Sequence, residues 1–227
     1  MKLNNVDIKT MIIQRRILSL LCALLAPCSI LFGLFGASNG NFPTWYMTVS
    51  DTYYANSKII MIGLLAATSV FFFSYRGYDV YDRICSLIEA ISALGIIVFP
   101  KNIPYVEYTG LFNLPVKISG VFHNISAGVL FVTFALQILF LFTKGSNELT
   151  SKKKLRNKIY IVCGSIILFF ALCMGLADTM IFTSWVPEWF PIKWLDEFFM
   201  LESFAFAYLV KSEAINRFND TISEKNI

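Results

Sequence analysis

Six long apolar stretches are the feature that most constrains how this chain can fold. A helix needs roughly 20 mostly apolar residues to cross a hydrocarbon core about 30 Å thick. The stretches lie at residues 17–36, 57–75, 84–100, 120–143, 159–182 and 195–211. Each is predicted to be helical, because an open strand in lipid would leave backbone amides and carbonyls unpaired. The sequence therefore predicts an all-α, polytopic membrane helical bundle of about six transmembrane helices, with residues 1–227 forming a single integral membrane domain.

Basic residues predict the orientation of this bundle. If the amino terminus lies inside, most of the 19 Lys and Arg residues fall in cytoplasmic segments, leaving Lys58, Lys101, Lys117 and Lys193 at the outer side. This bias is the one that the positive-inside rule describes. We therefore expect both termini on the cytoplasmic side. The basic cluster at 152–158 is expected to anchor a helix end near anionic lipid and not to bind nucleic acid.

Glycines within the stretches are expected to let helices approach closely, because lipid offers no hydrophobic drive for helix association. These residues are Gly33, Gly36, Gly63, Gly95, Gly128, Gly164 and Gly175.

Residue counts exclude several kinds of metal and redox site. The five cysteines form no Cys-x-x-Cys pair, which argues against a redox motif or a zinc knuckle. His123 is the single histidine, so a three-histidine zinc site or a bis-histidine haem cannot be built within this chain. We expect no cofactor and no metal.

Ionisable residues inside the predicted spans mark a candidate binding site, because charge is costly within a bilayer. From the helical rise, His123, Asp178 and Glu202 lie about 5, 6 and 10 Å below the outer ends of their helices, in one layer. Asp51 and Asp196 lie at outer helix ends and would cap this layer. The hypothesis is a polar pocket for a head group, a cation or a proton. The alternative is a buried polar network that orders the bundle.

Glu89 does not join that layer. It lies about 16 Å from the outer end of its predicted helix. We expect it to be a structural partner or to extend toward the inner leaflet.

A family resemblance rests on short motifs in the first two thirds of the chain. The motifs, in order, are Ser50-Asp51-Thr52, Ala93-Leu94-Gly95 with Phe99-Pro100, and His123 with Ala127 and Phe131. This layout resembles uncharacterised bacterial multi-pass membrane families and is similar to the DRAM-type (damage-regulated autophagy modulator) membrane proteins. The similarity covers about residues 20–145, and the Trp-rich stretch 184–194 departs from it. The resemblance implies a compact helical bundle connected with membrane lipid organisation, and a location in the bacterial inner membrane.

Three functions remain open from the sequence. The first is an integral membrane protein that binds or moves a lipid or small amphipathic molecule, with membrane lipids as its partners. The second is a membrane-embedded lipid hydrolase or transferase using His123 and carboxylates. The third is an assembly or accessory subunit, working as a homo-oligomer or with another membrane protein.

Overall fold

The described part of the chain is built almost entirely from helices. The computed structural model describes residues 5–35, 48–75, 77–144, 150–176 and 190–219. Its six long helices are α1 (Asn5–Phe35), α2 (Lys58–Ser74), α3 (Val80–Val98), α4 (Val116–Leu136), α5 (Ser151–Leu176) and α7 (Ile192–Lys211). The predicted all-α class is therefore confirmed.

Shorter elements complete the described residues. A 3-10 helix, η2 (Ser50–Tyr54), precedes α2, and a second, η4 (Asn216–Phe218), follows α7. Strands β1 (Tyr108–Thr109) and β2 (Leu114–Pro115) form an antiparallel hairpin between α3 and α4, with Tyr108 opposite Pro115. Its turn contains Gly110 at φ +77°, a left-handed conformation that glycine adopts without steric cost.

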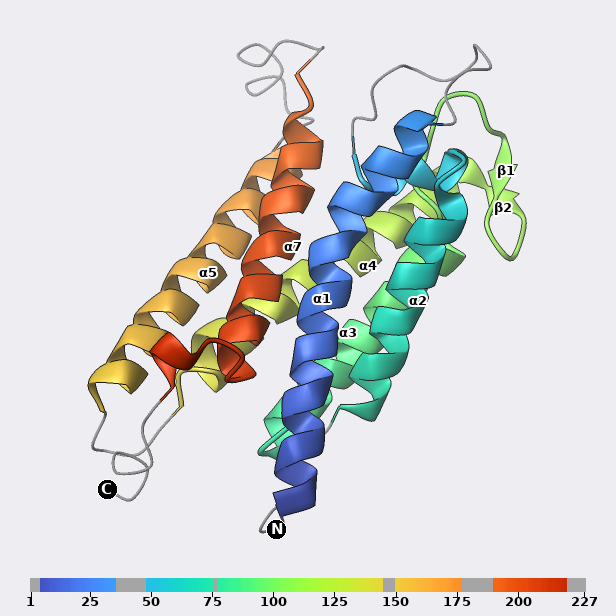
Figure 1. Ribbon diagram of the computed structural model, residues 1–227. Helices are drawn as coiled ribbons and strands as arrows, with labels where there is room; N and C mark the ends of the chain where they lie inside the picture. Colours follow the sequence, from blue (N-terminus) through green and yellow to red (C-terminus); the bar gives the residue numbers. More distant parts are fainter. Residues whose placement is uncertain (1–4, 36–47, 76, 145–149, 177–189, 220–227) are drawn as a thin grey trace.

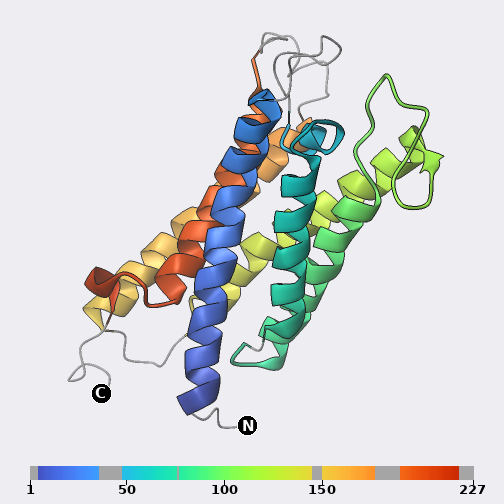
Figure 2. The ribbon, with the colours of Figure 1, turned by 45° about the vertical axis from the view of Figure 1, so that its right-hand side comes forward.

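The six helices form a closed ring in which each helix packs on its neighbours in the sequence, and α7 returns to pack on α1. Figures 1 and 2 show these helices running up and down in alternation. The start of α1 and the end of α7 lie at the same end of the bundle, which we call the terminal end (Figure 1). The β1–β2 hairpin lies at the opposite end, which we call the hairpin end.

Aromatic side chains fill the centre of the ring. The rings of Phe134 on α4 and Phe204 on α7 are stacked with their centroids 3.6 Å apart. Phe72 of α2 packs on both of them, and Tyr208 packs on Phe204 with 4.4 Å between centroids. Because all four side chains are buried, they tie α2, α4 and α7 together across the ring.

Three helices are long and apolar enough to cross a membrane, which supports an integral membrane protein. Among the described residues these segments are Ile8–Gly33, Val116–Leu141 and Ser151–Leu176, and Lys58–Ser74 is a shorter apolar helix. Several helices extend beyond the predicted spans, and α1 begins twelve residues before position 17. Hydropathy detects only the apolar part of a helix, whereas polar residues such as Lys and Gln continue it readily.

The turn between α2 and α3 is fixed by local hydrogen bonds. Asp79 and Asp82 form a reciprocal capping box at the start of α3. The Lys144 ammonium, after the end of α4, lies 2.7 Å from the Asp79 carboxylate. This hydrogen bond holds the pKa of Asp79 below its ordinary value. The loop at 79 is thereby tied to the chain segment that follows α4.

Candidate functional site

A cavity opens between α4, α5 and α7 at the hairpin end of the bundle. Its volume is about 340 Å³, which lies within the range of small-molecule sites in proteins. Helix α4 packs mainly on α3 and α5, and it has few direct contacts with α7. The cavity therefore lies in the part of the ring where α4 and α7, which run in the same direction, do not pack on each other.

The lining of the cavity changes from polar to apolar along the helix axes. Helices α4 and α7 both run away from the hairpin end, so later residues in each lie deeper. The polar residues His123 and Glu197 line the shallow part. Phe131 lies eight residues after His123, about 12 Å deeper, and Met200 lies one turn below Glu197. Thr48, Lys101, Asn124 and Lys193 also line the polar part of the cavity. The remaining lining residues, below or beside the polar part, are Ala127, Gly128, Val132, Ala171, Met174 and Gly175.

Two glycines keep the cavity wall open. A Cβ atom added at Gly128 or Gly175 would meet no atom within 4 Å, and the same holds for Gly63 outside the cavity. The prediction that these three glycines allow close helix contact is therefore wrong. It is confirmed at Gly95 and Gly164, where a Cβ would overlap the side chains of Ser126 and Leu139. Sequence alone cannot separate a glycine at a helix contact from one facing a cavity.

His123 is held by two hydrogen bonds at the polar end of the cavity. Its side chain is 3% exposed, with Nδ1 lying 2.9 Å from the Phe99 carbonyl oxygen and Nε2 lying 3.1 Å from Ser50 Oγ. A carbonyl oxygen can only accept, so Nδ1 carries the proton and Nε2 of the neutral ring is an acceptor. The Ser50 hydroxyl is thus placed to donate to the imidazole.

Glu197 completes the network around Ser50. Its carboxylate accepts the Val49 backbone N–H, and its Oε1 lies 3.3 Å from Ser50 Oγ. Because a hydroxyl has one proton, Ser50 can donate to His123 or to Glu197 but not to both at once. The network joins the residues before α2 to α4 and α7.

Lys101 forms the rim of the polar end. Its Nζ donates to Asp51 Oδ1 at 3.0 Å and to Thr48 Oγ1 at 3.1 Å. The Tyr54 hydroxyl donates to the Lys101 carbonyl oxygen at 2.7 Å, and partial burial raises the pKa of Tyr54 above its ordinary value. The mouth of the cavity thus has a positive and a negative group held next to each other.

The residues predicted to form one layer occupy different places. His123 lines the cavity, and Asp51 lies at its rim, where it forms an ion pair with the lining residue Lys101. Asp196 is buried at the start of α7, where neither carboxylate oxygen has a hydrogen-bond partner among the described residues. Asp178 lies outside the described residues.

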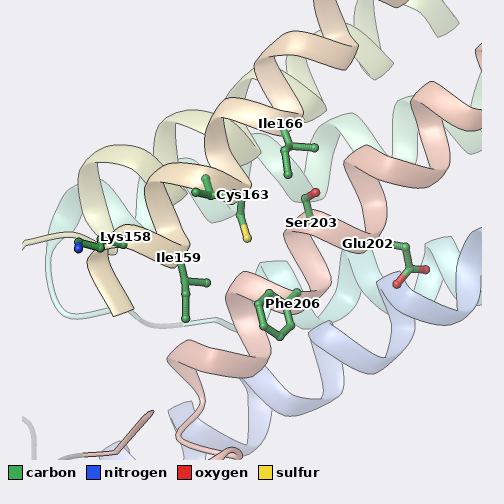
Figure 3. Close-up of a pocket in the computed structure, with 8 residues that line it drawn as sticks. Lys158, Ile159, Cys163, Ile166, Glu202, Ser203 and Phe206 are labelled. Carbon is green, nitrogen blue, oxygen red and sulfur yellow. The ribbon is translucent and has the colours of Figure 1, made fainter. Parts of the chain in front are cut away.

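Glu202 lies beside a second hollow and not in the cavity. This groove of about 400 Å³ runs between α5 and α7, and Figure 3 shows its lining. Ile159, Cys163 and Ile166 of α5 face Phe206 of α7 across it, whereas the Glu202 carboxylate is turned toward α1 (Figure 3). The structure does not bring Glu202 together with His123.

Ser50, Lys101, Asn124 and Glu197 are site residues that were not included in the predicted layer. Ser50 belongs to one of the sequence motifs, but its meeting with His123 and Glu197 depends on how the chain before α2 folds over the ring. No periodicity in the sequence encodes that contact.

Within the described residues, no group of three or more His, Cys, Asp or Glu side chains is placed to hold a metal ion. Comparisons of the chain with protein-family models, with curated proteins and with solved structures found no match.

Proposed function

We propose that this integral membrane protein binds a lipid or another small amphipathic molecule in the cavity between α4, α5 and α7. The change in lining from polar to apolar along the cavity carries this proposal. A polar head would lie beside His123, Lys101 and Glu197. The apolar part would extend past Phe131 and Met200, toward the middle of the bundle.

In the proposed membrane arrangement all six helices span, with both termini inside and the hairpin end facing out. The distribution of Lys and Arg supports this orientation. Helices α3 and α7 carry charged residues, but Glu89, Asp196 and Glu197 are buried in the bundle, where they would avoid lipid. The cavity would then open in the outer half of the bilayer, and the proposed location is a bacterial inner membrane.

Filling the cavity tests this proposal. Gly128→Leu and Gly175→Leu each add a large side chain at a position where the Cβ atom meets no other atom within 4 Å. Gly63→Leu is the matched control, because Gly63 also has open space around its missing Cβ but does not line the cavity. Native mass spectrometry of protein extracted from its membrane would measure the retained lipid. We expect wild type and Gly63→Leu to retain a bound amphipath that both cavity variants lose. A wild-type protein with no retained amphipath, or cavity variants that retain as much, would refute the proposal.

A second candidate function is acyl transfer or hydrolysis of a lipid ester, favoured by the 3.1 Å distance between Ser50 Oγ and His123 Nε2. In such a reaction the imidazole would take the serine proton as Ser50 Oγ attacks the ester carbonyl carbon. The ester C–O bond would then break, the imidazolium would return the proton to the leaving alcohol, and water or a second alcohol would remove the acyl group from Ser50. A fluorophosphonate probe would label Ser50 in wild type, but not in Ser50→Ala, and only weakly in His123→Gln. An unlabelled wild-type protein would leave binding as the function of the site.

A further inference from the structure

Glu89 is a carboxylic acid buried at the middle of α3. It is the tenth of the 19 residues of this helix, about 14 Å from either end. Its side chain is 0% exposed, so the predicted extension toward the inner leaflet is wrong. Neither carboxylate oxygen has a hydrogen-bond partner among the described residues. Buried polar groups without partners are rare in folded proteins, and each one calls for a specific explanation.

A second unpartnered polar group lies in the same interior. Gln137 is fully buried, and its side-chain Nε2 has no hydrogen-bond partner among the described residues. Its Oε1 accepts a hydrogen bond of 2.7 Å from the Tyr208 hydroxyl. Gln137 also begins a π-helical segment (Gln137–Leu141), a distortion frequently found at functional sites.

Among the described residues, the groups that face Glu89 provide no positive charge to balance an ionised carboxylate. The titratable side chains close enough to interact electrostatically with Glu89 are Cys22 on α1, Tyr208 on α7, and Cys85 and Asp82 on its own helix. From α2, the nearby Ser69 hydroxyl donates to the Ala90 carbonyl. An ionised carboxylate without donors or a cation is very costly in such surroundings, whereas the neutral acid is tolerated.

A row of polar side chains runs from this interior toward the terminal end. The Tyr208 ring packs on the Tyr75 ring with 6.2 Å between centroids. The Tyr75 hydroxyl accepts a hydrogen bond of 2.9 Å from Arg15 Nε, and Arg15 also lies 3.4 Å from the Tyr78 hydroxyl. Arg15 is 2% exposed, but Tyr78 is 57% exposed. The row therefore begins at the surface and ends in the interior.

We propose that Glu89 is a proton-binding site inside the bundle, reached from the terminal end along the hydroxyls of Tyr78, Tyr75 and Tyr208. Arg15, which donates to the first two hydroxyls and cannot itself give up a proton, holds them in place. The bound ligand is a single proton, taken up by the carboxylate to give the neutral acid and released as the reverse step. The site lies apart from the cavity beside His123. It therefore holds whether or not that cavity binds an amphipath.

Infrared difference spectroscopy of the purified protein tests this site, because a protonated carboxylic acid has its own C=O stretching band that shifts when the proton is replaced by deuterium. We expect wild type to show this band and to shift it after transfer to D2O. Glu89→Gln should remove the band. Glu107→Gln, which changes an exposed carboxylate of the hairpin, should keep it.

Four outcomes would overturn the proposal. A wild-type protein without the band has an ionised Glu89, and a band that never shifts in D2O belongs to a sealed, purely structural acid. Tyr75→Phe removes the hydroxyl that Arg15 contacts and should slow the shift; an unchanged rate refutes the route. If Glu89→Gln does not fold, Glu89→Asp keeps the acid and should move the band without removing it, and an unmoved band assigns it to another residue.

Discussion

Gly95 provides a sharp test of the helix packing, because α3 and α4 touch there without room for a side chain. A Cβ at position 95 would overlap Ser126 Oγ and lie 3.0 Å from Ser126 Cβ. Since carbon atoms pack best about 3.5–4.0 Å apart, Gly95→Ala must separate the helices by roughly 0.5–1 Å or displace Ser126. Overpacking of this kind costs about 1–3 kcal/mol.

The control is Gly63→Ala on α2, which meets no atom within 4 Å. It should be neutral or should gain up to about 1 kcal/mol from the higher helix propensity of alanine. Equilibrium unfolding in mixed SDS micelles would measure both free energies. The difference between Gly95→Ala and Gly63→Ala should be about 1–3 kcal/mol. Ser126→Ala, which removes the overlapping hydroxyl, should recover part of the loss in the double variant. Equal stabilities for the two alanine variants, or no recovery, would refute the packing between α3 and α4.

Two further predictions concern the core and the turn before α3. Phe204→Ala should destabilise the fold by about 3–5 kcal/mol, because Phe204 is buried against Phe134. Phe206→Ala, which changes a side chain 42% exposed on the same helix, should cost far less. Similar unfolding free energies for the two variants would contradict the central aromatic cluster. Asp79→Ala should cost about 1 kcal/mol through the lost helix cap, and Asp79→Asn, which can still cap, should cost less. Because the pKa of Asp79 is lowered in the fold, its ion pair stabilises the protein above about pH 4 and is lost as pH falls through the lowered value. If wild type still has a higher free energy of unfolding than Asp79→Asn at a pH below the lowered pKa, the ion pair is not the cause of that difference.

The hydropathy of the sequence predicted the helices because each one needs an apolar surface, whether it faces lipid or the bundle interior. The ends were less accurate: α5 begins at Ser151, eight residues before the predicted span, because a run of Lys and Arg is itself helix-forming. Arg15 was assigned to a cytoplasmic segment, yet it is buried within α1 and bonded to Tyr75. The orientation in the membrane and the resemblance to DRAM-type proteins stay predictions.

The candidate site was only partly within reach of sequence reasoning. His123 was identified because a lone histidine in an apolar helix is conspicuous. Its contacts with Phe99 and Ser50 join residues 24 and 73 positions apart, and Glu197 meets Ser50 across 147 positions. Such contacts form only when the six helices close into a ring. The depth of a residue along its own helix does not show which face of that helix it occupies. Glu202 was misplaced beside His123 for this reason.

A density map of the protein in lipid nanodiscs tests the account most directly. If the cavity binds an amphipath, the map will show an elongated feature between α4, α5 and α7, with its polar end beside His123 and its remainder running past Phe131. A cavity filled by side chains, or one that holds only water, would contradict the account.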